Sequence, residues 1–219
     1  MKPEDVAEKY NINLKKLEDE QIKLAKTLSI KDSRDFSEVE LVGGCDNIFF
    51  ENKIISAIVV VDRDGEIVAQ EYFSDKLKFP YISGFRAYRE LPSMVSCYDK
   101  LEVKPEIMFI HGHGTAHVRL GLASHFSIAT GSPAIGVADN LVIGEEKGES
   151  VLLDGKEVGK VLVSKEGSKP IYVSPGNLVS LKSAIEFTKK YIVKPHKLPE
   201  PIVLAHKYGK KVREEIFNK

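Results

Sequence analysis

The chain has 219 residues, 42% of them hydrophobic, which is enough for a substantial core in one α/β domain over residues 1–219. Its 32 basic and 32 acidic residues cancel, so composition predicts no global attraction to nucleic acid or membrane, and any nucleic-acid binding has to rest on local chemistry. Cys45 and Cys97 lack the spacing of a zinc site and predict buried thiols in a reducing compartment. Since no apolar run approaches the roughly 20 residues of a membrane span, we expect a cytoplasmic, monomeric protein.

The first predicted element is an amphipathic helix over residues 13–28. Leu14, Leu17 and Leu24 recur there at helical spacing between charged residues, so one face is expected to pack on the body. Residues 29–40 are polar and predict a loop.

A three-stranded meander is predicted to begin the sheet. Residues 40–50 and 53–61 are apolar runs separated by a short polar stretch, which is typical of an antiparallel hairpin. A turn signal at 62–65 and an alternating pattern over 66–73 predict the third strand.

Asp46 is a carboxylate in the middle of the first of these strands. A buried unpaired charge there would be strongly destabilising, so it requires an explanation. Three remain open from the residues alone: a metal ion neutralises it, a basic side chain neutralises it, or it faces solvent at a bulge near Gly43 and Gly44.

A loop over 79–84 carries an apolar, aromatic tip and leads into a helix that continues to about residue 101. Proline is tolerated in a first helical turn, so Pro92 places Glu90 at the N-terminus of this helix, beside the sheet. The alternative to a functional Glu90 is a capping carboxylate.

The most informative stretch is a buried strand over residues 107–110 that runs into a glycine-punctuated turn with three histidines. His111, Gly112 and His113 directly follow the strand, and His117 closes the turn. Ligands of α/β sheets gather at the carboxyl ends of strands, and glycines allow close approach of the backbone, so the turn is a candidate site. The alternative is a tight turn whose histidines are merely exposed.

The remaining chain alternates short strands and helices, as a mixed α/β sheet requires. The expected elements are a helix from residue 121, a strand at 133–138, a flexible charged loop at 144–150, a hairpin of 151–153 with 160–164, a strand at 171–176, a helix at 180–192, an extended linker at 195–201 and a basic terminal helix led by 203–206. Asp139 and Asn140 directly follow the strand at 133–138.

In this order, the chain resembles the endonuclease V family over about residues 13–210. The motifs that carry the resemblance are Phe79-Pro-Tyr-Ile82, Tyr88-Arg-Glu-Leu-Pro92, Gly112-His-Gly-Thr-Ala-His117, Gly121-Leu-Ala-Ser-His125, Ile135-Gly-Val-Ala138, Val173-Ser-Pro-Gly176 and Glu200-Pro201 with Leu204-Ala-His206. The resemblance implies an RNase H-like mixed sheet with flanking helices. It also implies a nuclease that uses Mg²⁺ or Mn²⁺ to cut a phosphodiester bond near hypoxanthine, in deaminated DNA or in inosine-containing RNA.

The resemblance also implies roles for individual residues. Asp46 is then the metal carboxylate of the first strand, Glu90 a second acidic residue that positions metal-bound water, and His206 a further catalytic histidine. Hard divalent cations prefer such oxygen ligands. The implied substrate-binding residues are a strand-separating wedge of Pro80, Tyr81 and Ile82, and a base pocket of Gly84, Gly112, Gly121 and Ala138 together with His117.

Three positions depart from the family pattern. His111 stands where the family has a catalytic Asp, Asp139 where it has a Lys, and Ser83 where the wedge ends in Pro. The resemblance makes His111 a catalytic residue and a metal ligand. Its imidazole suits manganese or softer metals. Asp139 replaces a cation that attracts phosphate by an anion that repels it, although an acid there is also placed to supply the missing ligand.

Two functions therefore compete. The first is a metal-dependent endonuclease of the endonuclease V type with altered or weakened activity on inosine-containing DNA or RNA. The alternative is a non-catalytic homologue that binds such nucleic acid, and the changes at His111 and Asp139 favour it.

Overall fold

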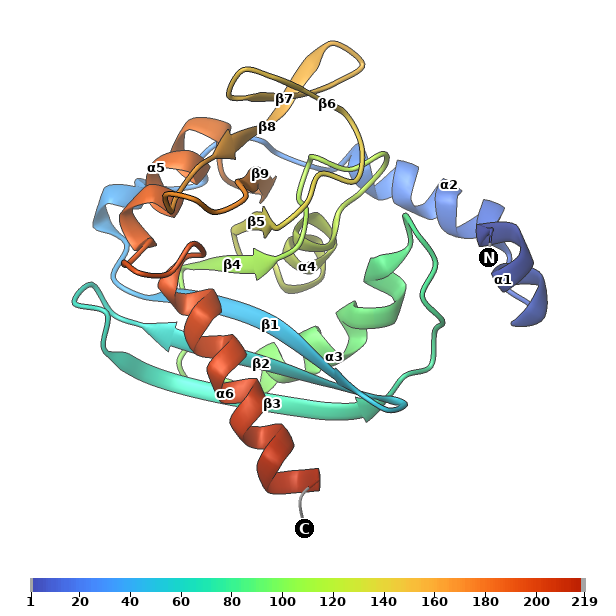
Figure 1. Cartoon of the computed structure of the whole chain (residues 1–219), viewed down its shortest axis with the longest axis horizontal. Coiled ribbons are helices and arrows are strands. Elements are labelled where there is room, and N and C mark those ends of the chain that lie inside the picture. The colour runs from blue at the N-terminus through green and yellow to red at the C-terminus, as the bar shows by residue number, and fades with distance from the viewer. Residues whose placement is uncertain (1, 218–219) are drawn as a thin grey trace.

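One mixed sheet organises the computed structural model, which describes residues 2–217 (Figure 1). Its strands follow the spatial order β3-β2-β1-β4-β5-β9-β8-β7-β6. The strands are β1 Val42–Phe50, β2 Lys53–Val61, β3 Ile67–Lys76, β4 Ile107–His111, β5 Ala134–Ala138, β6 Glu145–Lys147, β7 Ser150–Leu153, β8 Lys156–Leu162 and β9 Ile171–Asn177.

The pairing of the central strands confirms the predicted fold class. β1, β2 and β3 form the expected antiparallel meander. β4 then pairs with β1 in parallel and β5 pairs with β4 in parallel, so the carboxyl ends of β1, β4 and β5 meet at one edge. This order, with helices on both faces, is that of an RNase H-like mixed α/β sheet.

The helices cover the sheet on both sides. In Figure 1, α6 runs across one face of β1, β2 and β3, and α3 lies on the other. The helices are α1 Pro3–Lys9, α2 Leu14–Ala25, the short 3-10 helix η1 Phe36–Glu38, α3 Arg86–Lys100, α4 Leu122–Thr130, α5 Leu181–Tyr191 and α6 Glu200–Phe217. Within residues 2–217, no helix is long and apolar enough to cross a membrane.

Strand β4 explains why this part of the sequence is continuously apolar. Ile107 and Phe109 belong to the core cluster that includes α5 and α6, whereas Met108 and Ile110 belong to the cluster that includes α3 and α4. Successive side chains of a strand point to opposite faces, so both faces of β4 need apolar residues. His111 therefore continues on the α6 face, two residues beyond Phe109.

The predicted position of Glu90 at a helix N-terminus was wrong. Helix α3 begins at Arg86, so Glu90 lies in its second turn and Pro92 lies inside the helix. A proline there removes one helical hydrogen bond. Burial of the helix face that carries Met94 and Cys97 offsets this loss, because these side chains are at most 1% exposed.

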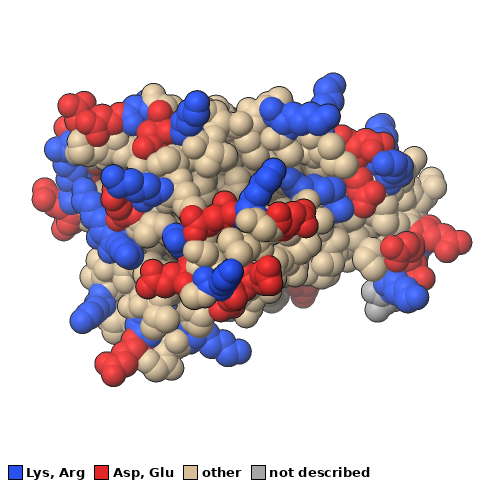
Figure 2. All heavy atoms as spheres, turned by 90° about the horizontal axis from the view of Figure 1, so that it is seen from above, with Lys and Arg blue, Asp and Glu red and all other residues tan. Residues whose placement is uncertain are grey.

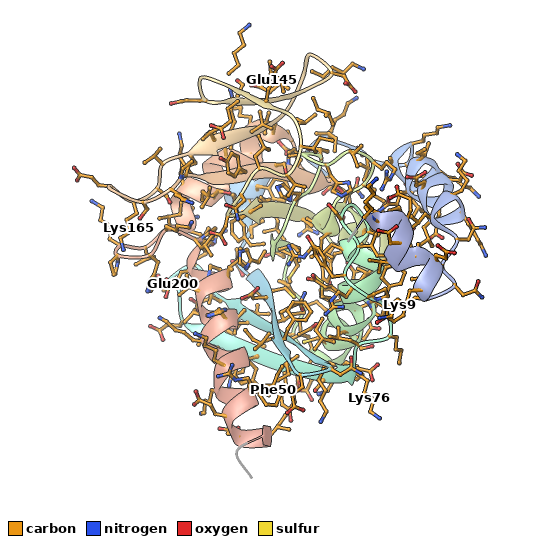
Figure 3. The ribbon with its side chains drawn as sticks, turned by 45° about the vertical axis from the view of Figure 1, so that its right-hand side comes forward. Lys9, Phe50, Lys76, Glu145, Lys165 and Glu200 are labelled. Atoms are coloured by element: carbon orange, nitrogen blue, oxygen red, sulfur yellow. The ribbon has the colours of Figure 1, made fainter. Side chains whose placement is uncertain are left out.

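Two segments expected to be irregular are regular. Residues 144–150 were expected to form a flexible loop, but β6 and β7 form a hairpin there, which projects from the body at labelled Glu145 (Figure 3). The linker expected at 195–201 is shorter, because α6 already begins at Glu200. Cys45 and Cys97 are free and buried, as predicted.

Candidate active site at the strand ends

Asp46, His111 and Asp139 meet where β1, β4 and β5 lie side by side, Asp46 in the middle of β1 and the other two residues at the carboxyl ends of β4 and β5. Cys45 pairs with Ile110, so Asp46 lies one residue beyond this pair on β1. His111 ends β4, and Asp139 directly follows β5. The strand pairing thus brings residues 46, 111 and 139 together on the face that α6 covers.

The buried carboxylate of Asp46 is neutralised by basic side chains. It is 5% exposed, and its Oδ1 and Oδ2 accept hydrogen bonds from His111 Nδ1 at 2.8 Å and His206 Nδ1 at 2.7 Å. Although burial pushes the pKa of Asp46 upward, these two hydrogen bonds lower it to about 2. The bulge alternative was wrong, because Val42–Phe50 pairs with β2 in unbroken register.

His111 bridges two carboxylates. Its Nδ1 faces Asp46, and its Nε2 lies 2.8 Å from Oδ2 of Asp139. Burial alone lowers the pKa of His111, but the hydrogen bonds to Asp139 and Asp46 raise it to about 9. The other oxygen of Asp139 accepts from Lys197 Nζ at 2.6 Å. The hydrogen bond from His111 is the main reason that the pKa of Asp139 falls below its usual range.

Glu90 lies beside this row of charges but joins it through intermediaries. It is 2% exposed, and its oxygens accept from Arg86 Nε at 2.5 Å and Asn47 Nδ2 at 2.7 Å. Arg86 also donates from Nη2 to the backbone carbonyl of His111 at 3.1 Å. Arg86 and Asn47 thus link the Glu90 carboxylate to the strand ends.

The donor set does not fit the divalent cation that the resemblance implies, in the arrangement that the structure has. Among residues 2–217, no group of three His, Cys, Asp or Glu side chains is arranged to hold a metal ion. Each oxygen of Asp46, Glu90 and Asp139 already accepts from a side chain of the protein. Both nitrogens of His111 are engaged as well, so the imidazole has no lone pair for a metal.

A cleft of about 560 Å³ opens beside the row. Five of the predicted substrate-binding residues line it, namely Tyr81, Gly84, Gly112, His117 and Ala138, together with the catalytic candidates Glu90 and His111. Its volume falls in the range of about 300–1,000 Å³ that is usual for small-ligand sites.

The other three predicted substrate-binding residues, Pro80, Ile82 and Gly121, lie outside the cleft. Whereas Tyr81 is 67% exposed at the tip of its loop, the neighbouring Ile82 is 2% exposed and packs with Ala7 and Phe85. A Cβ on Gly121 would lie 2.3 Å from backbone oxygens of the histidine turn, so this glycine permits close packing.

His117 faces the cleft in a defined protonation state. Its Nδ1 accepts from the backbone N–H groups of Arg119 and Leu120 at 3.2 and 3.1 Å. Burial is the main reason that its pKa falls to about 4, so the ring is neutral near pH 7. The proton of a neutral ring with an accepting Nδ1 lies on Nε2, which is therefore a hydrogen-bond donor.

Two cationic residues of this site were not identified from the sequence. Arg86 lines the cleft next to Glu90, and Lys197 reaches Asp139 from the segment before α6. The signal for Arg86 was its position four residues before Glu90 on one helix. Lys197 had no local signal, because its partner lies 58 residues away in the sequence.

The face of the molecule seen from above carries both signs of charge. Figure 2 shows lysine and arginine side chains interspersed with aspartate and glutamate on the face seen from above. This face agrees with the balanced composition, and Arg86 and Lys197 are cations of the site itself.

Comparisons with known proteins identify relatives over most of the chain. A family model for endonuclease V matches residues 22–207. Endonuclease V of Thermosipho melanesiensis is 37% identical over 190 residues, 83% of each protein. The crystal structure of endonuclease V from Streptomyces avermitilis superposes with a TM-score of 0.84 at 28% identity, covering 93% of this chain and 94% of that one. Endonuclease V of Ciona intestinalis, solved with a 24mer DNA containing an inosine followed by a ribo-adenosine, gives 0.82 at 25% identity, covering 93% and 98%.

Proposed function

The chain belongs to the endonuclease V family, and from this premise and the geometry of its cleft we propose that it is an endonuclease that cleaves DNA or RNA near inosine. The observation that carries the proposal is the juxtaposition in one cleft of the exposed Tyr81, the donor His117 and the strand-end residue His111. An aromatic tip, a pocket for a base and a polar strand end are what a base-flipping nuclease requires.

Tyr81 and the cleft suit the recognition of an extruded base. A rigid aromatic side chain fills the gap that a flipped base leaves in a stack. The carbonyl oxygen of hypoxanthine accepts a hydrogen bond where adenine carries an amino donor. The Nε2–H of His117 therefore favours hypoxanthine and opposes adenine.

Asp46 and His206 supply a proton acceptor for hydrolysis. The ionised Asp46 only accepts, so His206 donates from Nδ1 and, in its neutral form, leaves Nε2 free. We assign to Nε2 the removal of a proton from the water whose oxygen attacks phosphorus while the P–O bond to the leaving oxygen breaks. Arg86 lines the cleft, where its guanidinium can neutralise phosphate charge.

The divalent cation expected from the resemblance, Mg²⁺ or Mn²⁺, enters the proposal as a variable of the assay. In the present arrangement each carboxylate oxygen of Asp46, Glu90 and Asp139 already accepts from a side chain, so none of the steps above is assigned to an ion. Metal dependence stays a prediction that the cleavage assay decides.

Cleavage of labelled oligonucleotides tests the proposal. Single- and double-stranded DNA and RNA with one inosine are incubated with the full chain in Mg²⁺, in Mn²⁺ and in EDTA, beside matched strands with adenosine. We expect cleavage near inosine only. Asp46→Asn should lose cleavage, because an asparagine amide has one acceptor oxygen and cannot accept hydrogen bonds from both His111 and His206. Inosine-specific cleavage that survives in Asp46→Asn would contradict the role assigned to Asp46 and His206.

The alternative is a non-catalytic homologue that binds inosine-containing nucleic acid. The observation that favours it is the complete pairing of the carboxylates Asp46, Glu90 and Asp139 by the protein's own cations and amide. Tight, inosine-selective binding without cleavage under any metal condition would select this function.

We further propose that residues 1–219 act as one domain and as a monomer. The central sheet supports this, because one sheet carries all strands of residues 2–217. Light scattering coupled to size-exclusion chromatography tests it, and a mass of twice 24.4 kDa would contradict the monomer.

A further inference from the structure

The two departures from the family pattern at the strand ends meet in space. His111 stands in place of an acid and Asp139 in place of a cation, and His111 Nε2 lies 2.8 Å from Asp139 Oδ2. Compared with the family pattern, the acidic residue therefore stands at the end of β5 instead of β4, and the basic residue at the end of β4 instead of β5. The charge of the pair is unchanged when His111 carries both ring protons.

The hydrogen bonds require this doubly protonated ring. Both nitrogens of His111 face carboxylate oxygens at 2.8 Å, from Asp46 on one side and Asp139 on the other. An ionised carboxylate only accepts, so each ring nitrogen has to donate, and only an imidazolium carries two N–H groups. A positive charge thus lies between two carboxylates, where a metal ion would otherwise lie.

Lys197 extends the row on its far side. Its Nζ lies 2.6 Å from Asp139 Oδ1, and its side chain is 26% exposed. The charges therefore alternate along Asp46, His111, Asp139 and Lys197. One N–H of the lysine ammonium is used by Asp139, which leaves two for a ligand at the open end of the row.

A divalent cation meets two obstacles at this row. The oxygens of Asp46 and Asp139 that an ion would use already accept from His111, His206 and Lys197. An ion that entered would also lie beside the imidazolium, and like charges at such short range repel each other. Binding would require His111 to lose both hydrogen bonds and a proton.

We propose that the row Asp46–His111–Asp139–Lys197 takes the place of a divalent cation in this chain, so that inosine-containing nucleic acid binds without Mg²⁺ or Mn²⁺ and Lys197 contacts its phosphate. This inference rests on the proposed function for the identity of the ligand. The assignment of the row as a substitute for the metal stands on the hydrogen bonds alone.

Direct titration with Mn²⁺ tests the cation site without nucleic acid. The electron paramagnetic resonance signal of free Mn²⁺ is followed as the full chain is added, for the wild type, for Asp46→Asn and for the double variant His111→Asp with Asp139→Lys. We expect equal signals for the wild type and Asp46→Asn, and uptake of one ion by the folded double variant. A wild type that takes up one Mn²⁺ and loses it in Asp46→Asn overturns the proposal.

Oligonucleotide binding tests the second half of the proposal. Fluorescence anisotropy with an inosine-containing strand is measured in EDTA and in Mn²⁺. We expect the same affinity in both. Binding that appears only with the metal overturns the inference, and it does so even when the double variant fails to fold.

Lys197 is tested by the salt dependence of the same binding. Lys197→Gln should weaken binding of inosine and adenosine strands alike and reduce the slope of log K against log salt by about 1, because one phosphate contact is lost. Lys182→Gln is the matched control, since Lys182 is 83% exposed on α5 and should leave the slope unchanged. Equal slopes in the two variants remove Lys197 from the phosphate site.

The outcomes separate this inference from the proposed function. Equal affinity for inosine and adenosine strands in every buffer would contradict the proposed function while the Mn²⁺ titration still reports on the row. Uptake of Mn²⁺ by the wild type together with inosine selectivity would contradict only the inference.

Discussion

Alkaline pH should destabilise this protein through one side chain, His111. In the folded chain its pKa is about 9, and the ordinary value of 6.5 applies after unfolding. A raised folded pKa stabilises fully below about pH 6.5, and the stabilisation is lost as the pH rises through about 9. The difference between the folded and unfolded pKa values of His111 corresponds to about 3 kcal/mol of unfolding free energy. Because the His111 side chain is 24% exposed, solvent screening makes this an upper bound.

The acid side of the profile has the opposite sign. The pKa of Asp46 is about 2 in the folded chain against an ordinary 3.8, so its contribution is present above about pH 4 and is lost as the pH falls through 2. The Asp46–His111 hydrogen bond contributes to both shifts, so the two contributions are not added. Stability from this row is therefore largest between about pH 4 and 6.5.

Urea unfolding of the wild type and of His111→Asn measures the effect. Other groups titrate in both proteins, so the loss of unfolding free energy from about pH 6 to about pH 10 is compared between them. We expect the wild type to lose up to about 3 kcal/mol more than the variant, because an asparagine amide carries no titratable charge. Equal losses would refute an imidazolium between the two carboxylates.

Four further substitutions test the cleft and its support. Tyr81→Ala should weaken binding to inosine duplexes and change stability by less than about 0.5 kcal/mol, whereas Ile82→Ala should cost about 2–5 kcal/mol of unfolding free energy, both measured on the same preparations. His117→Ala should reduce the affinity ratio of inosine to adenosine strands about tenfold, the value of one hydrogen bond, and an unchanged ratio would remove His117 from recognition. Gly44→Ala places a Cβ 2.1 Å from the backbone of Pro201, so thermal unfolding should show a loss of about 1–3 kcal/mol as α6 shifts.

Much of the sheet follows from the sequence because apolar runs and their alternation are local signals. The meander and the buried β4 were predicted from such runs, and their pairing puts Asp46 and His111 side by side. The structure brings these two residues into contact at 2.8 Å, whereas Glu90, the third acidic or metal-site candidate, joins them only through Arg86 and Asn47. The same alternation puts Asp139 on the face of Val137, which explains how it joins them.

Other parts of the site depend on contacts that no local pattern signals. Lys197 meets Asp139 only because α6 packs its first turn on β1, where Gly44 admits the backbone of Pro201. Pro92 misled the helix assignment, since tertiary burial tolerates a proline that a local rule excludes.

The wedge loop acquires its rigidity from a distant part of the chain. Gln21 of α2 is fully buried and donates from Nε2 to the backbone carbonyl of Gly84 at 3.2 Å. Arg119 donates to Gln21 Oε1 at 2.6 Å and to the same carbonyl at 3.3 Å. Both contacts fix the base of the loop, and the buried Ile82 anchors its inner side, while Tyr81 and Ser83 are exposed and line the cleft. A tip held in this way would lose little conformational entropy on contact with a ligand, so helix α2 supports the loop although it does not line the cleft.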